Sequence, residues 1–197
     1  KQLKRAKKLY KEKYYKQSNK IDRLNNKKIR IGYFSSDFRA HPTMYLISSI
    51  LKLHDKSKFE IYLYSFAPKE DRYTEIVKKS GCIFKDIKKL NYIEAVELAR
   101  NDHLDIAIDL MGYIKYNRMN IFSYRIAPIQ INYLGYPGSL GADIMDYIIA
   151  DKIIIPKEYE KFYSEKIIRM PSCYQCNDNT KEICKEPISR KLFNLPD

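Results

Sequence analysis

The chain contains no apolar run near the roughly 20 residues that a membrane-spanning helix requires. Its lysine-rich start lacks the apolar stretch that a secretory signal carries after its positive residues. No Gly-x-Gly-x-x-Gly follows a candidate strand, and no P-loop is present. These absences argue against a membrane-spanning protein, a secreted protein and the common dinucleotide and P-loop binders, and they make the cytoplasm the default compartment.

Metal-binding patterns are also lacking. Cys173 and Cys176 have the spacing of a zinc pair, but no second pair of cysteines or histidines lies at the expected distance. We therefore interpret Cys82, Cys173, Cys176 and Cys184 as reduced thiols of a cytosolic protein. We expect neither a metal nor a cofactor.

Basic residues exceed acidic ones and give the chain a net charge of +13. Much of the excess lies in the first twenty residues, and elsewhere lysines alternate with acids, as over 157–161. We interpret the charge as solvated surface. The alternative is a basic patch that binds nucleic acid by counterion release, which predicts an affinity that falls steeply with salt.

The start of the chain differs in pattern from the rest. The 197 residues, 45% of them hydrophobic, suffice for one ordinary domain with a flanking segment. Leu3, Ala6, Tyr10 and Tyr14 recur at helical spacing, and polar, breaker-rich sequence follows as far as residue 27. We expect a basic helical linker over 1–27 and one domain over 28–197.

Short apolar runs alternate with longer amphipathic ones from residue 28 onward. This alternation is typical of an α/β fold and predicts a Rossmann-like parallel sheet with helices on both faces. The predicted strands are 29–34, 59–66, 82–84, 105–110, 129–134 and 147–150, and helices are predicted to start near Pro42, Glu70 and Tyr92.

Polar side chains gather where the first predicted strand ends, which is where parallel sheets bind ligands. Ser35, Ser36, Asp37, Arg39 and His41 lead into a helix whose N-terminal amides favour anionic or oxygen-rich ligands. His41 could transfer a proton, but a histidine at a helix entry commonly bonds only to the backbone. This loop is the first candidate site.

Two further turns follow the strands predicted at 105–110 and 129–134. After the first, Gly112 permits close backbone approach, and Lys115 and Arg118 could serve a phosphate or a hydroxyl-bearing ligand. After the second, the Gly-Tyr-Pro-Gly sequence at 135–138 predicts a rigid turn. For both, a purely structural turn is the alternative.

Five blocks resemble, in order and spacing, the N-terminal catalytic lobe of the O-linked N-acetylglucosamine transferase family, including its bacterial and plant Spindly-like members. They are 35–43, 53–60, 112–113, 127–138 and 145–151, and the likeness runs from about residue 28 to residue 178. It implies one lobe of a two-lobed GT-B glycosyltransferase. Such enzymes transfer a sugar, here N-acetylglucosamine from UDP-GlcNAc, to Ser or Thr hydroxyls of proteins.

The resemblance also implies roles for individual residues. The family's His-Pro-Thr histidine, His41 here, lies in its active site, and Asp102 matches an aspartate that has been considered as a proton acceptor. Which group acts as the base is disputed in the family. The positions implied to bind substrate are Pro42, Thr43, Gly112, Tyr113, Arg118, Tyr136, Pro137 and Gly138.

Departures from the family pattern leave alternatives open. Ile114 replaces the threonine that usually follows Gly-Tyr. Some relatives use GDP-fucose, so a protein O-fucosyltransferase is one alternative. A metal-dependent transferase is disfavoured, because Asp143 and Asp146 do not have the spacing of an Asp-x-Asp triplet.

Two parts of the family's enzymes are missing from this sequence. One is the second lobe, which supplies most of the nucleotide contacts, and the other is the tetratricopeptide repeats that hold acceptor proteins; the basic linker could be the end of those repeats. We therefore expect the segment to be inactive alone, as a fragment, a truncated product or a lobe that awaits a partner chain. A non-catalytic ligand- or protein-binding module is the other alternative.

Overall fold

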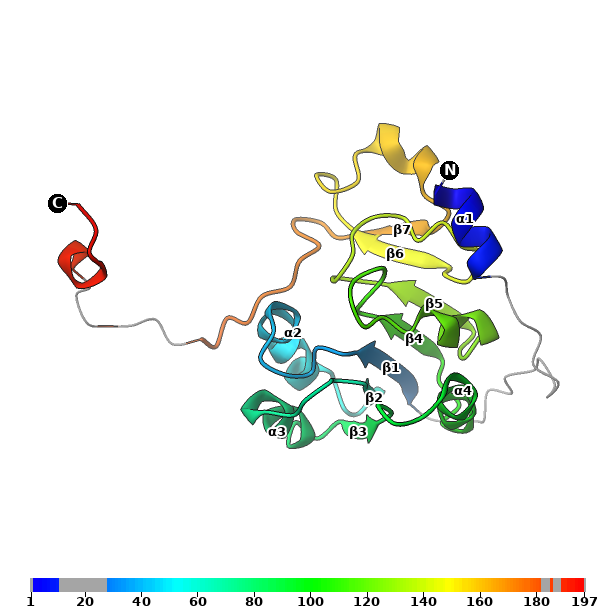
Figure 1. Ribbon diagram of the computed structural model, residues 1–197, viewed down its shortest axis with the longest axis horizontal. Helices are drawn as coiled ribbons and strands as arrows, with labels where there is room; N and C mark the ends of the chain where they lie inside the picture. The colour runs from blue at the N-terminus through cyan, green and yellow to red at the C-terminus, as the bar shows by residue number, and fades with distance from the viewer. Residues whose placement is uncertain (1, 11–27, 182–184, 186–188, 197) are drawn as a thin grey trace.

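The computed structural model describes residues 2–10, 28–181, 185 and 189–196, and a seven-stranded sheet runs through its centre (Figure 1). Every neighbouring pair of strands is parallel, and the strand order is β3-β2-β1-β4-β5-β6-β7. The strands are β1 (Ile29–Ser35), β2 (Phe59–Ser65), β3 (Ile83–Asp86), β4 (Ile106–Asp109), β5 (Ile129–Asn132), β6 (Tyr147–Ala150) and β7 (Lys166–Arg169).

The six predicted strands are confirmed, with ends that shift by no more than two residues. The sequence did not indicate β7. This strand lies at the edge of the sheet, where it pairs only with β6, through contacts such as Ile148 with Ile167. Because three of its four residues are exposed, β7 lacks the apolar pattern that marks the other strands.

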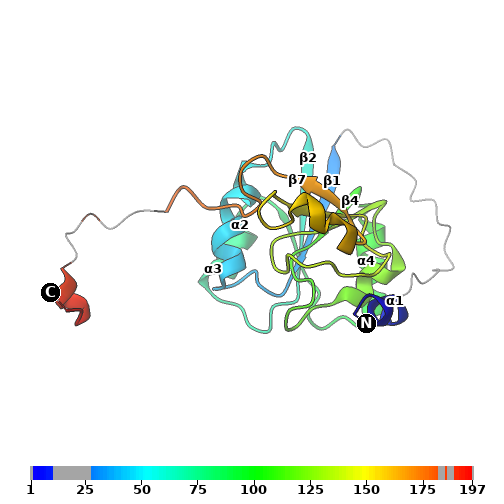
Figure 2. The ribbon, with the colours of Figure 1, turned by 90° about the horizontal axis from the view of Figure 1, so that it is seen from above.

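Helices cover both faces of the sheet, as predicted (Figure 2). Side chains alternate along each strand, so Ile31 and Tyr33 of β1 pack toward α2 (Pro42–Leu53) and α3 (Arg72–Lys78). Phe34, from the same strand, packs on the opposite face with α4 (Tyr92–Asn101), where its ring stacks on Tyr64 at 4.3 Å. The two faces therefore form two hydrophobic cores.

The predicted N-terminal helix is present as α1 (Gln2–Leu9). It packs on the α4 side of the domain, where Ala6 is buried and the ring of Tyr10 lies 5.9 Å from that of Tyr113. The rest of the predicted linker, with Tyr14, lies outside the described residues, as does Cys184.

Short 3₁₀ helices complete the described part of the chain: η1 (Met119–Tyr124), η2 (Lys157–Phe162) and η3 (Arg190–Phe193). Of these, η1 adds buried side chains to the core under α4. Among the described residues, no helix has both the length and the apolar character needed to cross a bilayer.

Candidate active site

The strand order reverses between β1 and β4, because the chain runs outward from β1 to β2 and β3 and then crosses back to β4. In open parallel sheets, ligands bind at this point, outside the carboxyl ends of the strands. A cavity of about 490 Å³ lies there. Its walls include Asp37, Arg39, His41, Pro42 and Thr43 from the β1–α2 connection, Ile114 and Lys115 after β4, and Leu134 and Gly135 after β5.

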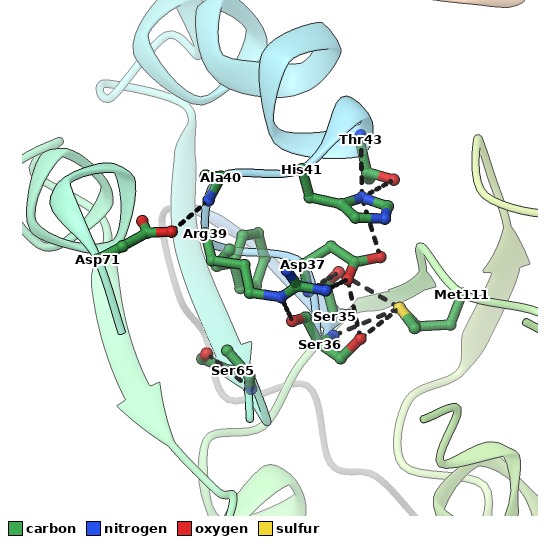
Figure 3. A network of polar contacts seen from close by, with 12 residues as sticks. Ser35, Ser36, Asp37, Arg39, Ala40, His41, Thr43, Ser65, Asp71 and Met111 are labelled. Atoms are coloured by element: carbon green, nitrogen blue, oxygen red, sulfur yellow. Dashed lines mark hydrogen bonds and ion pairs between the residues drawn. The ribbon is translucent and has the colours of Figure 1, made fainter. Parts of the chain in front are cut away.

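The loop that follows β1 is a buried polar network (Figure 3). Ser35, Ser36 and Asp37 are each at most 3% exposed. The Asp37 Oδ1 atom accepts a hydrogen bond from Ser36 Oγ at 3.0 Å and lies 3.4 Å from the Arg39 guanidinium. The sulfur of Met111 accepts from Ser35 Oγ at 3.4 Å and from the Ser36 amide at 3.3 Å, and so joins this loop to the one after β4.

Helix α3 holds the outer part of the same loop in place. Asp71, the N-cap of α3, accepts a hydrogen bond from the Ala40 amide at 2.7 Å, and Thr74 donates to the Phe38 carbonyl at 2.8 Å. Asp71 and Thr74 also form a capping box, so the residues that start α3 position the loop as well. The loop is therefore anchored on both sides of Arg39.

His41 is the N-cap of α2 and faces the cavity. Its Nδ1 lies 3.2 Å from the Thr43 amide, which can donate to it, 3.2 Å from the Thr43 hydroxyl, which can donate or accept, and 3.3 Å from Asp37 Oδ2, which accepts. Nδ1 serves one of these partners at a time, because it is an acceptor in one neutral tautomer and a donor in the other. Among the described residues, none hydrogen-bonds to Nε2, which is left for a ligand.

A buried carboxylate shapes the turn after β4. Asp109 accepts hydrogen bonds from the amides of Met111 at 3.1 Å and Gly112 at 2.8 Å. Burial raises the pKa of Asp109 to about 7, although these two hydrogen bonds act in the opposite direction. Gly112 has a φ of 59°, and a Cβ at this position would lie 2.5 Å from the Cβ of Tyr136. The predicted close approach at Gly112 is therefore made by Tyr136.

The turn after β5 separates the candidate site from a second, larger cavity of about 890 Å³. Leu134 and Gly135 line the first cavity, whereas Tyr113, Tyr136 and Gly138 line the second, beside α1. Five of the twelve described residues that line the larger cavity are aromatic, and none of the twelve is a histidine or carries a carboxylate. We place the candidate chemistry in the smaller cavity for that reason. Pro137 lines neither, and its carbonyl accepts a hydrogen bond from the Tyr163 hydroxyl at 3.1 Å.

Arg118 does not reach either cavity. Its guanidinium donates to the carbonyls of Ile87 and Leu90, each at 2.7 Å, and lies over the rings of Phe66 and Tyr92. These contacts tie the segment after β4 to the connection between β3 and α4. Arg118, which the sequence predicted to serve a ligand, thus binds backbone carbonyls in this structure.

Asp102 lies apart from His41. It follows α4, and its carbonyl accepts a hydrogen bond from Arg30 at the amino end of β1. Its carboxylate accepts from the Tyr64 hydroxyl and from Lys85, each at 2.5 Å. His41 follows the other end of β1, which has seven residues and is thus about 20 Å long. Asp102 is therefore not part of the site around His41.

The cavity also includes a residue that the sequence did not indicate. Gln175 belongs to the chain that follows β7, yet it lines the same cavity as His41 and Lys115. No periodic pattern surrounds it, since this part of the chain is neither helix nor strand. Only the path of the chain across the sheet reveals it.

Comparisons with known proteins agree with this architecture. The family model described as "Glycosyl transferase family 41" matches residues 2–191. A solved structure of a Thermobaculum terrenum O-GlcNAc transferase mutant aligns with a TM-score of 0.80 and 29% sequence identity, over 88% of this chain and 33% of that one. The GT-B lobe predicted from the sequence is confirmed by this match.

Curated relatives point to the same family. The probable UDP-N-acetylglucosamine–peptide N-acetylglucosaminyltransferase SEC of Arabidopsis thaliana is 34% identical over 153 residues, 77% of this chain and 16% of the relative. The Caenorhabditis elegans UDP-N-acetylglucosamine–peptide N-acetylglucosaminyltransferase is 35% identical over 159 residues, 80% of this chain and 14% of the relative. This sequence thus spans less than a fifth of either relative. The chain belongs to glycosyl transferase family 41.

Proposed function

We propose that this chain is the N-terminal catalytic lobe of a protein O-glycosyltransferase that transfers N-acetylglucosamine from UDP-GlcNAc to Ser or Thr hydroxyls. Membership of family 41 and the printed activities of the relatives support the reaction class. The observation that carries the proposal is the His41–Asp37 pair at the wall of the cavity, at the switch point of the sheet.

The proposed chemistry is a direct displacement. The acceptor hydroxyl oxygen forms a bond to the anomeric carbon, the bond from that carbon to the diphosphate oxygen breaks, and UDP leaves with the electron pair. The hydroxyl proton passes to His41 Nε2, provided that Nδ1 keeps its own proton and donates a hydrogen bond to Asp37 Oδ2, 3.3 Å away. Asp37 then stabilises the imidazolium that forms.

Asp37 favours the tautomer that can act as a base. When Nδ1 accepts from the Thr43 amide instead, Asp37 Oδ2 is a buried acceptor with no hydrogen bond. Leaving a buried carboxylate oxygen unpaired costs about 1–3 kcal/mol or more, whereas the opposite tautomer costs the Thr43 amide its N-cap hydrogen bond, about 1 kcal/mol. Lys115, Arg39 and the N-terminal amides of α2 add positive potential beside the cavity, which suits a diphosphate leaving group.

We propose 1–27 as a linker and 28–197 as the lobe, with a second lobe and an acceptor-binding region as partners. The chain covers 33% of the solved relative, which leaves room for both. The identity of the donor is a separate part of the proposal, since the same geometry would also bind GDP-fucose. A module that binds a ligand without turnover is the competing function.

The first test measures the binding of the donor to the purified chain. Saturation-transfer NMR is the method, because it detects weak complexes. His41→Asn removes the imidazole but keeps a good N-cap, and His103→Asn is its matched control, because asparagine tolerates the positive φ of that residue. We expect UDP-GlcNAc to bind, His41→Asn to weaken it roughly five- to tenfold through a lost polar contact, and His103→Asn to have no effect.

Turnover is measured as UDP release in the presence of a Ser-containing peptide. Where turnover is seen, His41→Asn lowers the rate by roughly 10²–10⁴, the usual worth of general-base help. Binding without UDP release supports the binding module. If neither UDP-GlcNAc nor GDP-fucose binds to the chain, the donor-binding role is wrong.

A further inference from the structure

After β7 the chain crosses back over the carboxyl ends of the strands to reach α2 (Figure 1). We call residues 170–178 the strap. The Tyr174 amide donates to Asp151 Oδ2 at 2.8 Å, and the Tyr174 carbonyl accepts from the Tyr133 hydroxyl at 2.9 Å. Farther along, the Asn177 carbonyl accepts from Ser49 at 3.1 Å. The strap is therefore fixed to the residues that directly follow β5 and β6, and to α2.

Gln175 lies between these anchors and lines the candidate site. Hydrogen bonds hold Tyr174 on one side of it, and Asn177 and Asp178 on the other, where Asp178 accepts from Ser48 at 2.6 Å. The Gln175 side chain itself has no hydrogen bond to any residue that the structure describes. A backbone fixed on both sides thus holds Gln175, an exposed residue whose amide has no hydrogen bond within the described part of the chain, at the wall of the cavity.

The chemistry of the amide limits what it can recognise. Arg39, Lys115 and Asp37 are the charged side chains of the cavity wall, and His41 is the titratable imidazole. Among the described residues of that wall, Gln175 is the one primary amide, and it offers both donors and an acceptor without charge. Such a group matches neutral hydroxyl or acetamido substituents, whereas a phosphate is better served by the two cations.

We propose that Gln175 binds the transferred sugar, through hydrogen bonds from its side-chain amide to a hydroxyl or acetamido group, and so contributes to the choice of sugar. This inference rests on the proposed donor-binding function of the same cavity. It assigns to the strap a part in substrate recognition in addition to its packing role.

The test compares a donor with the same nucleotide lacking the sugar. Dissociation constants for UDP-GlcNAc and for UDP are measured by saturation-transfer NMR on the whole chain, for wild type, Gln175→Leu and Asn177→Leu. Leucine has nearly the shape of glutamine without its hydrogen bonds. Asn177→Leu is the matched control, because it removes an exposed amide from the same strap but keeps the backbone bond to Ser49.

We expect Gln175→Leu to weaken UDP-GlcNAc binding roughly five- to twentyfold, from the loss of one or two hydrogen bonds, and to leave UDP binding within twofold of wild type. Asn177→Leu should change neither. Equal weakening of both ligands, or no change, overturns the role of Gln175 while the donor-binding function stands. If wild type binds neither of these ligands nor GDP-fucose, the donor-binding function fails as well.

Discussion

The Nδ1 atom of His41 lies 3.3 Å from Oδ2 of Asp37, a carboxylate that is 3% exposed beneath the candidate site. The same nitrogen lies 3.2 Å from the Thr43 amide. One imidazole nitrogen thus has a donor and an acceptor within reach. The partner that Nδ1 binds decides whether Nε2 faces the cavity as a hydrogen-bond acceptor or carries the proton. This choice can be measured directly.

We predict that Asp37→Asn reverses the tautomer of His41. We expect Asp37 to keep the proton of the neutral imidazole on Nδ1, which leaves Nε2 free to accept one; an asparagine amide turned toward Nδ1 would donate to it and leave the proton on Nε2. Long-range ¹H–¹⁵N NMR of the neutral imidazole distinguishes the two forms. Identical tautomers in wild type and variant would contradict the role assigned to Asp37.

Gly112→Ala should destabilise the fold by about 2–4 kcal/mol, from the cost of a left-handed backbone together with overpacking. The added Cβ would meet the Cβ of Tyr136 at 2.5 Å, at a φ of 59°. Gly81→Ala is the matched control: its φ is also positive, at 78°, but the nearest atoms belong to the flexible Lys56 side chain. Urea unfolding should therefore show a clearly larger loss at Gly112, and equal losses would argue against the close packing on Tyr136.

Asp109 should make stability depend on pH. Its folded-state pKa is raised to about 7 from the ordinary value of 3.8, so the native state holds a proton that the unfolded state has released between these values. The free energy of unfolding should consequently fall as pH rises from about 4 to about 7, by up to about 1.4 kcal/mol per pH unit, and then level off.

Asp109→Asn removes this titration and still offers one acceptor to the turn amides. The contributions of the other titrating groups are the same in both proteins and cancel in the comparison. The free energy of unfolding of the variant should therefore fall less steeply over this pH range. Urea unfolding at half-unit pH steps measures the difference. Parallel curves for wild type and variant would show that Asp109 does not carry the effect.

Asp102→Asn should lower stability and leave donor binding unchanged. The substitution weakens the hydrogen bonds from Tyr64 and Lys85, which we expect to cost about 1–3 kcal/mol. UDP-GlcNAc affinity, measured alongside His41→Asn, separates a structural role from a role in the site. A loss of donor affinity comparable to that of His41→Asn would return Asp102 to the candidate site.

Local patterns in the sequence determined most of the fold. Short apolar runs mark β1 and β2, and longer amphipathic spacing marks α2 and α4, because these signals depend on neighbours along the chain. The edge strand β7 escaped prediction, since an exposed edge does not require apolar residues. The ends of β1, β4 and β5 also predicted where the site lies, because parallel strands end at one edge of the sheet.

Only the tertiary structure decided which predicted site residues meet. It joined His41 to Asp37, separated Tyr136 and Gly138 into a second cavity, and placed Asp102 near the amino end of β1. It also brought Gln175 to the cavity from the far end of the chain. Periodicity reports the neighbours of a residue along one element, whereas the contacts of Asp102 and Gln175 depend on how distant elements pack against one another.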